Sequence, residues 1–273
     1  MISIFLIAAP LTLFSQNYLA DQYERAELLF LNRNYFDAVT EYKRLLFFDG
    51  DKNYLYKANY MIGQCYKNGA KWDDAVKYFK IAGLSTSDNG EIYDAEIEIV
   101  RVNILRKTSY QALTILDHLE SNPVYTDKNN EINYWRGWAY MFADEWEKAA
   151  ESFGYIDNEH QLKKYCEQVT DDKYSITFAR LISYILPGSG EVYTGHYFEG
   201  LISLGWNVLW GYLSVNAFIQ DRTLDGILIS SLLWLRFYRG GIQSGEKSAE
   251  DENLKITNAA LKFLQMHYRG IKP

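Results

Sequence analysis

An alanine recurs every 37 residues through the first part of the chain. A small or modest residue stands twelve positions before each of these alanines, and a large apolar residue stands four positions after it. A fixed period of this length predicts stacked pairs of helices, because one pair cannot bury its apolar face alone. The small residues let two antiparallel helices approach closely, and the large residue fills the space beside the next repeat. The three sets are Ala26, Gly63, Val100 and Gly137, then Ala38, Ala75, Ala112 and Ala149, then Tyr42, Phe79, Leu116 and Phe153.

This small-large-small pattern resembles the tetratricopeptide repeat, here with three extra residues in the connections. It covers about residues 18–158, and it is most complete in the second and fourth repeats. The first and third repeats are more degenerate, and Asn103 stands where the family has an aromatic residue. The resemblance implies an all-α solenoid of four 37-residue repeats over residues 16–172, and a role in binding proteins or peptides.

In tetratricopeptide-repeat proteins the concave face is built from the first helix of each pair. Aromatic, amide and charged side chains on this face suit an extended peptide or a partner helix. The alternative, that Tyr60 and Trp138 only pad the inner wall, stays open. Carried over by position, the face would contain Tyr23, Glu27, Tyr60, Gln64, Lys67, Arg101, Tyr134 and Trp138.

The sequence contains no pattern that predicts catalysis. Four histidines have none of the spacings of a zinc site, and Cys65 and Cys166 do not form a CxxC pair. Ser189 lies in PGSG, which is neither a nucleophile elbow nor a phosphate-binding loop. We therefore expect a non-enzymatic protein with no catalytic residue, no cofactor, no metal and no small-molecule substrate. Whether the two cysteines are oxidised stays open.

The charge is distributed unevenly along the chain. Residues 1–172 contain 18 Lys and Arg against 27 Asp and Glu, whereas residues 173–273 contain 10 against 8. An acidic first part argues against binding to nucleic acid, because phosphates need a basic surface. The contrast also predicts a domain boundary near Asp172.

The chain begins with the uncharged run MISIFLIAAPLTLFSQ. The run is too short to cross a bilayer and has the length of a signal-peptide hydrophobic region, so residues 1–15 are predicted to be a signal peptide. The alternative is a buried first helix.

The second part of the chain contains a second uncharged run. Residues 200–220 lack any charged side chain over 21 positions, which as a helix would cover a hydrocarbon core of about 30 Å. After a polar turn at Asp221–Thr223, the apolar run GILISSLLWLRFYRGGIQSG returns, with Arg236 and Arg239 inside it. The two runs predict a hydrophobic helical hairpin, followed by an amphipathic helix near Leu254–Leu264.

The stretch that precedes this hairpin resembles a small bacterial membrane domain with the pattern S-x-x-x-PGxGxxYxGxxxxG. The resemblance implies that residues 173–273 are membrane-associated, with lipid contact through residues 176–245. It also implies a turn where the chain enters the membrane, and there we expect a positive φ at Gly190 or Gly195. The matching positions are Ser183, Pro187, Gly188, Gly190, Tyr193, Gly195 and Gly200.

Two interpretations of the hairpin stay open. Arginines flank the hairpin, so the positive-inside rule favours both ends in the cytoplasm, whereas a cleaved signal peptide would export the repeats. The hairpin then lies in the membrane interface or enters it partway, or the first 15 residues are not a signal. The other interpretation is a soluble helical cap on the solenoid, with Trp206 and Trp210 in its core.

These observations lead to a functional hypothesis. The chain is predicted to be a protein-binding adaptor of the bacterial cell envelope, at the inner membrane with periplasmic repeats, whose partner is an envelope protein or peptide. Secretion and membrane-protein assembly are the candidate processes. The alternative is a soluble periplasmic structural module of a larger envelope complex.

Overall fold

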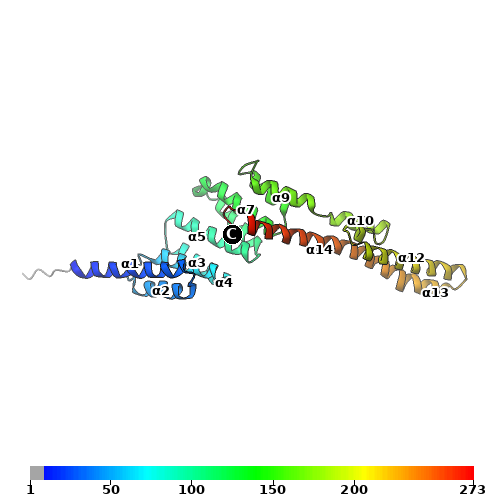
Figure 1. The fold of residues 1–273 in the computed structure, drawn as a ribbon, viewed down its shortest axis with the longest axis horizontal. Helices are drawn as coiled ribbons and strands as arrows, with labels where there is room; N and C mark the ends of the chain where they lie inside the picture. The colour runs from blue at the N-terminus through cyan, green and yellow to red at the C-terminus, as the bar shows by residue number, and fades with distance from the viewer. Residues whose placement is uncertain (1–8) are drawn as a thin grey trace, which may run out of the picture. The chain divides into compact units, whose positions relative to one another are not determined.

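The computed structural model describes residues 9–273, with side chains from Tyr18 onward. Every regular element in these residues is a helix, which confirms the predicted all-α class (Figure 1). Residues 1–8 of the predicted signal peptide lie outside the described residues, and the remainder of that segment forms the start of the first helix. Cleavage after residue 15 therefore stays a prediction.

The chain divides into two compact units. The repeat unit contains the residues up to Lys164 together with Ile271–Pro273, and the second unit is Tyr165–Gly270. The division falls inside helix α9, Gln161–Asp172, whereas the charge pattern predicts a boundary at the end of that segment.

The repeat unit consists of successive helical hairpins, which run from blue to green in Figure 1. The first helices of the four repeats are α1, α3, α5 and α7, and the second helices are α2, α4, α6 and α8. Their bounds are α1 Ala9–Leu31, α2 Tyr35–Phe48, α3 Leu55–Asn68, α4 Trp72–Leu84, α5 Asn89–Leu105, α6 Ser109–Glu120, the 3₁₀ turn η1 Pro123–Lys128, α7 Asn129–Phe142 and α8 Trp146–Gly154.

The packing of the repeats follows the predicted periodicity. All four repeat alanines and all four large residues after them are completely buried. A Cβ atom added to Gly63 would lie 2.7 Å from the Phe79 ring, and one added to Gly137 would lie 2.5 Å from the Phe153 ring. Glycine is therefore needed at these two positions so that the large ring can lie against the backbone of the first helix.

Each first helix ends in the same left-handed turn. The N–H of Lys71 donates to the carbonyl of Tyr66 at 2.8 Å, and the N–H of Glu145 donates to the carbonyl of Tyr140 at 2.9 Å. The turn reverses the chain within three residues and sets the second helix against the first. Its positive-φ residues are again 37 positions apart: Arg33, Ala70, Lys107 and Asp144, with φ between 55° and 66°.

The second unit is a helical hairpin with a short helical entrance. Its helices are α10 Ile176–Ile185, α11 Ser189–Tyr193, α12 Tyr197–Ile219, α13 Thr223–Leu228, the π-helical turn η2 Ile229–Trp234 and α14 Leu235–His267. Because α13, η2 and α14 follow one another without a gap, the return arm is continuous. Trp206, Trp210 and Phe237 stack between the two arms with ring centroids 5.5–6.1 Å apart.

The structure corrects the membrane-spanning interpretation of this hairpin. None of the helices in residues 9–273 combines the length with the apolar character that crossing a bilayer requires. Helix α12 has 23 residues, but its run includes Asn207, Ser214 and Asn216, and the return arm carries Arg236 and Arg239. These polar groups lower the hydropathy of both arms, so the 21-residue uncharged stretch alone was a misleading signal.

Candidate functional site

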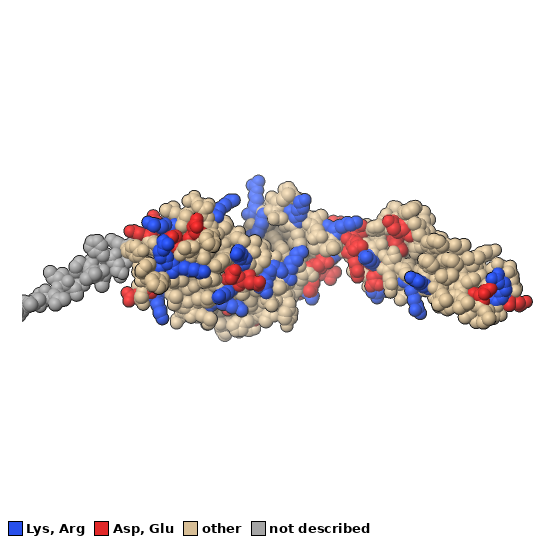
Figure 2. All heavy atoms as spheres, turned by 90° about the horizontal axis from the view of Figure 1, so that it is seen from below, with Lys and Arg blue, Asp and Glu red and all other residues tan. Residues whose placement is uncertain are grey.

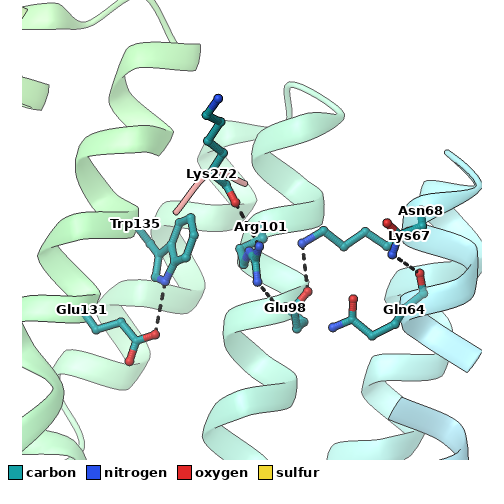
Figure 3. A network of polar contacts seen from close by, with 8 residues as sticks. All are labelled: Gln64, Lys67, Asn68, Glu98, Arg101, Glu131, Trp135 and Lys272. Carbon is teal, nitrogen blue, oxygen red and sulfur yellow. Dashed lines mark hydrogen bonds and ion pairs between the residues drawn. The ribbon is translucent and has the colours of Figure 1, made fainter. Parts of the chain in front are cut away.

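A buried ionic network lies on the first helices of the second and third repeats (Figure 3). The Lys67 ammonium on α3 donates to a Glu98 carboxylate oxygen on α5 at 3.0 Å. The Arg101 guanidinium, one turn further along α5, donates to the other Glu98 oxygen. The side chains of Lys67 and Glu98 are only 9% and 5% exposed, so one carboxylate balances two cations in a place with little water.

Burial affects the pKa of Lys67 in this network. Desolvation lowers the pKa of Lys67, and the neighbouring Arg101 charge lowers it further, whereas the Glu98 carboxylate opposes both effects. The ion pair therefore offsets only part of the cost of burying the ammonium.

Arg101 also joins α5 to α7, Asn129–Phe142, the first helix of the fourth repeat. Its guanidinium lies 4.9 Å from the centre of the Trp135 ring, in a cation–π contact. The Trp135 N–H donates to the Glu131 carboxylate at 3.5 Å. Three successive first helices thus share one polar wall, and they are the helices that the tetratricopeptide resemblance predicts on the inner face of the repeats.

A short piece of chain outside any helix lies against this wall. The Arg101 guanidinium donates to the main-chain carbonyl of Lys272 at 2.9 Å, and the Tyr134 hydroxyl donates to the main-chain carbonyl of Ile271. Figure 3 shows the Lys272 carbonyl facing Arg101 while the Lys272 side chain points away from the network. The wall therefore contacts two consecutive carbonyls of Ile271–Pro273. We call Lys67, Glu98, Arg101, Tyr134 and Trp135 the inner-wall site.

The structure brings some of the predicted groove residues together. Lys67, Arg101 and Tyr134 belong to the inner-wall site. Gln64 lies one turn before Lys67, and its carbonyl accepts a hydrogen bond from Asn68 at 2.8 Å. Tyr60 packs on Phe79 with ring centroids 5.4 Å apart, and burial raises its pKa to about 12.

The other predicted groove residues lie elsewhere or are covered. Tyr23 on α1 packs against Tyr42 and Tyr54, with Glu27 exposed one turn further along α1. Trp138 is only 3% exposed and lies near Tyr134 and Phe142, so it offers a partner little surface and contributes to packing.

Sequence reasoning missed three parts of the site. Glu98 stands three residues before Arg101, a spacing that could have indicated an ion pair along α5. Trp135 directly follows a predicted residue, but the repeat pattern gives it no role. No sequence signal pointed to Ile271–Pro273, because this segment is far from the repeats along the chain.

The reactive residue types in the described part of the chain are poorly placed for chemistry. Both cysteines are free and buried, and burial raises the pKa of each thiol to about 12, which disfavours the nucleophilic thiolate. Burial lowers the pKa of His160, whose Nδ1 accepts a hydrogen bond from the N–H of Leu162 at 3.2 Å. Residues 9–273 contain no cluster of three or more potential metal ligands.

The residues of the predicted membrane turn meet at the joint between α10, α11 and α12. Gly188 and Gly195 have φ of 95° and 87°, so the expected positive φ is present at Gly195 but not at Gly190. Gly190 donates its N–H to the buried Ser183 hydroxyl at 3.1 Å. The turn after Gly195 repeats the hydrogen bond of the tetratricopeptide-like turns, from the N–H of His196 to the Glu191 carbonyl at 2.8 Å.

The remaining motif residues support this joint. The Tyr193 hydroxyl accepts a hydrogen bond from the N–H of Ser175 at 3.2 Å, and Tyr193 packs edge-on against Phe178. Pro187 directly precedes the left-handed Gly188, and Gly200 lies against the Gly188 backbone. The motif therefore builds a close helix–helix joint, while its contact with a membrane stays a prediction.

Comparison with known families agrees with the repeat architecture. The family model for the tetratricopeptide repeat matches residues 57–82, which run from α3 through the turn into α4. No curated protein and no solved structure matches the chain. The matched repeat indicates an interaction scaffold of the kind that binds other proteins.

Proposed function

We propose that the repeat unit is a non-catalytic adaptor that holds an extended segment of a partner protein on its inner wall. The observation that carries this proposal is the pair of donors, Arg101 and Tyr134, directed at consecutive main-chain carbonyls. Main-chain carbonyls are present in every extended peptide, and side chains on either side of them remain available for selection.

The Arg101 side chain of the inner-wall site is already held in position for such a ligand. Glu98 and the Trp135 ring fix the Arg101 guanidinium from two directions, so little side-chain freedom is lost when a peptide binds. A hydrogen bond from a charged donor in a partly buried place contributes about 1.5–3 kcal/mol. Arg101 is a donor of this kind, whereas the neutral Tyr134 hydroxyl contributes about 0.5–1.5 kcal/mol. The two donors and the adjacent aromatic surface therefore suit a partner of moderate affinity.

Removing the two donors is expected to reduce capture of the partner strongly. The full-length Arg101→Met, Tyr134→Phe double variant keeps the apolar stems and the ring, so it removes hydrogen bonds with little loss of packing. We expect a reduction of at least about tenfold in the partner recovered from cell extract, because two hydrogen bonds are lost. Quantitative mass spectrometry of the captured proteins measures this.

The matched control is Arg136→Met on the same helix α7. Arg136 pairs with Asp117 and Glu120 at 3.0 and 2.9 Å, away from the inner-wall site. We expect this variant to capture the partner as the unmodified chain does. If the double variant is folded by circular dichroism and still recovers the same proteins as Arg136→Met, the inner wall is not the binding surface.

We further propose that α12 rests on a lipid surface without crossing it. The exposed face of α12 is large and apolar, whereas its packed face is small and polar, the reverse of a helix on a water-soluble domain. Gly200, Asn207, Ser214 and Ala217 are the buried residues of this helix. Figure 2 shows the hairpin as mostly uncharged surface up to the charged groups at its tip. The exposed stripe is Leu201, Val208, Tyr212, Val215 and Ile219, each 52–74% exposed.

Vesicle flotation tests the lipid contact. We expect the full chain to float with phosphatidylglycerol-containing vesicles, and the Val208→Asp, Tyr212→Asp variant to stay at the bottom of the gradient, because charged groups resist transfer to the membrane interface. The control is Phe36→Asp, Phe47→Asp in the repeat unit, where both rings are more than 80% exposed. Equal flotation of the two double variants would remove α12 as the lipid-binding face.

We propose the bacterial cell envelope as the site of action, with the repeats in the periplasm. The uncharged run of residues 1–15 supports export, and the apolar face of α12 supports a position at the inner membrane. The partner would then be an envelope protein, with secretion or membrane-protein assembly as the process. The mass of the protein purified from cells tests whether residues 1–15 are removed.

A further inference from the structure

The inner-wall site already has an occupant from its own chain. Ile271–Pro273 belongs to the repeat unit, although it is separated from the repeats by more than a hundred residues of sequence. The two contacts it makes with Arg101 and Tyr134 use main-chain carbonyls only. Ile271 itself is 66% exposed, so its side chain is not what holds the segment in place.

We propose that Ile271–Pro273 is an intramolecular ligand that occludes the inner-wall site until a partner segment displaces it. This inference rests on the proposed function, because it assigns the same two donors to a competitor of the partner. A tethered segment has an effective concentration in the millimolar range, so even weak contacts keep the site largely occupied. The partner must therefore bind more strongly than the segment does.

The geometry also indicates the chemistry of a competing partner. The site presents two donors, a guanidinium and a phenol, that bond to the carbonyls of two consecutive residues. It recognises an extended protein segment through its backbone, and it places little demand on the side chain at the position of Ile271, which is 66% exposed. A folded helix is a poor competitor, because its carbonyls already accept hydrogen bonds within the helix.

A peptide titration tests this proposal. The probe is a fluorescein-labelled hexapeptide with the sequence of residues 268–273, YRGIKP. We expect the chain that lacks residues 271–273 to bind the probe at least about tenfold more tightly than the full chain, because the tethered competitor is gone. Fluorescence anisotropy measures both affinities.

Two variants of the shortened chain assign the binding to the site. Tyr134→Phe removes a single hydroxyl and is expected to weaken probe binding, whereas Arg136→Met is expected to leave it unchanged. A second probe, YRGAKP, changes only the position of the exposed Ile271 and is expected to bind as tightly as the first, because the site contacts the carbonyl of this residue.

Three results would overturn the proposal: equal binding of the probe to the full and shortened chains, no binding to either, or binding that ignores Tyr134→Phe. None of these results refutes the adaptor proposal, because the capture experiment that tests it uses the full chain and no added peptide. The opposite outcome is also distinguishable. If substitution of Arg101 and Tyr134 leaves partner capture unchanged while the shortened chain binds the probe tightly, the adaptor proposal is refuted. The segment Ile271–Pro273 is then still a ligand of the site.

Discussion

Replacing Glu98 with glutamine is expected to destabilise the repeat unit by about 3–5 kcal/mol, because it leaves the buried Lys67 ammonium and the partly buried Arg101 guanidinium without a counter-charge. Lys67 and Arg101 both donate to this carboxylate, and the Lys67 side chain is only 9% exposed. A glutamine oxygen can accept one of the two hydrogen bonds, but it cannot balance either charge. Urea unfolding of the full chain, with hydrogen exchange of α3 and α5 as the local readout, measures the loss.

The comparison variant is Lys67→Met. It removes one cation and keeps the Glu98–Arg101 pair, so its cost is expected to be clearly smaller than that of Glu98→Gln. Exchange in α12 serves as an internal control and is expected to be unaffected by either variant, since α12 belongs to the other compact unit. Equal losses for the two variants would mean that the charge balance does not determine the stability of this wall.

The helical repeats were predictable because their packing depends on residue size at fixed intervals. Ala75 and Phe79 indicate a close helix pair through volume alone, and the structure buries both completely. The left-handed turns were not predictable in this way. Arg33, Ala70, Lys107 and Asp144 adopt the same positive φ, yet they share no chemical property, so the turn is imposed by the packing of the two helices.

The inner-wall site was predictable only in part, for a similar reason. Position within the repeat placed Lys67 and Arg101 on one face, because first helices recur in register. Their connection depends on Glu98, whose role is set by the separation of α3 and α5 rather than by local sequence. The position of Ile271–Pro273 on the inner-wall site depends on the tertiary structure, which no periodic sequence pattern predicts.

The hairpin shows the opposite error, because a local sequence pattern predicted a membrane-spanning helix that the structure does not contain in the described residues. An uncharged run of 21 residues has the length of a membrane span, but Asn207 and Ser214 lie on its packed face, where they serve contacts within the unit. The Asn207 amide donates to the Ser203 carbonyl at 2.8 Å, and the Ser214 hydroxyl donates to the Gly226 carbonyl at 3.3 Å. A count of charged residues takes no account of uncharged polar side chains or of their position on the helix.

The second large effect is expected at Gly188, where alanine should destabilise the joint of the second unit by roughly 3 kcal/mol or more. Two independent causes combine there. Gly188 has φ of 95°, a conformation that an L-residue adopts at a cost, and a Cβ atom would collide with the carbonyl of Gly200. Because the colliding group is backbone, α12 would have to shift away from α11. Thermal unfolding and hydrogen exchange in α10–α12 measure the effect.

Two neighbouring glycines separate these causes. Gly195 has φ of 87°, but a Cβ atom there would have no other atom within 4 Å, so Gly195→Ala reports the backbone conformation alone and is expected to cost about 1 kcal/mol. Gly200 lies within α12 without a positive φ, and its Cβ would lie 2.6 Å from the Gly188 carbonyl, so Gly200→Ala reports the collision, less the gain in helix propensity of about 1 kcal/mol. We expect Gly200→Ala to cost more than Gly195→Ala, and Gly188→Ala to cost more than either. If Gly188→Ala destabilises the second unit no more than Gly195→Ala does, α12 can shift away from α11 at little cost. The close approach of α11 and α12 is then not what stabilises the joint.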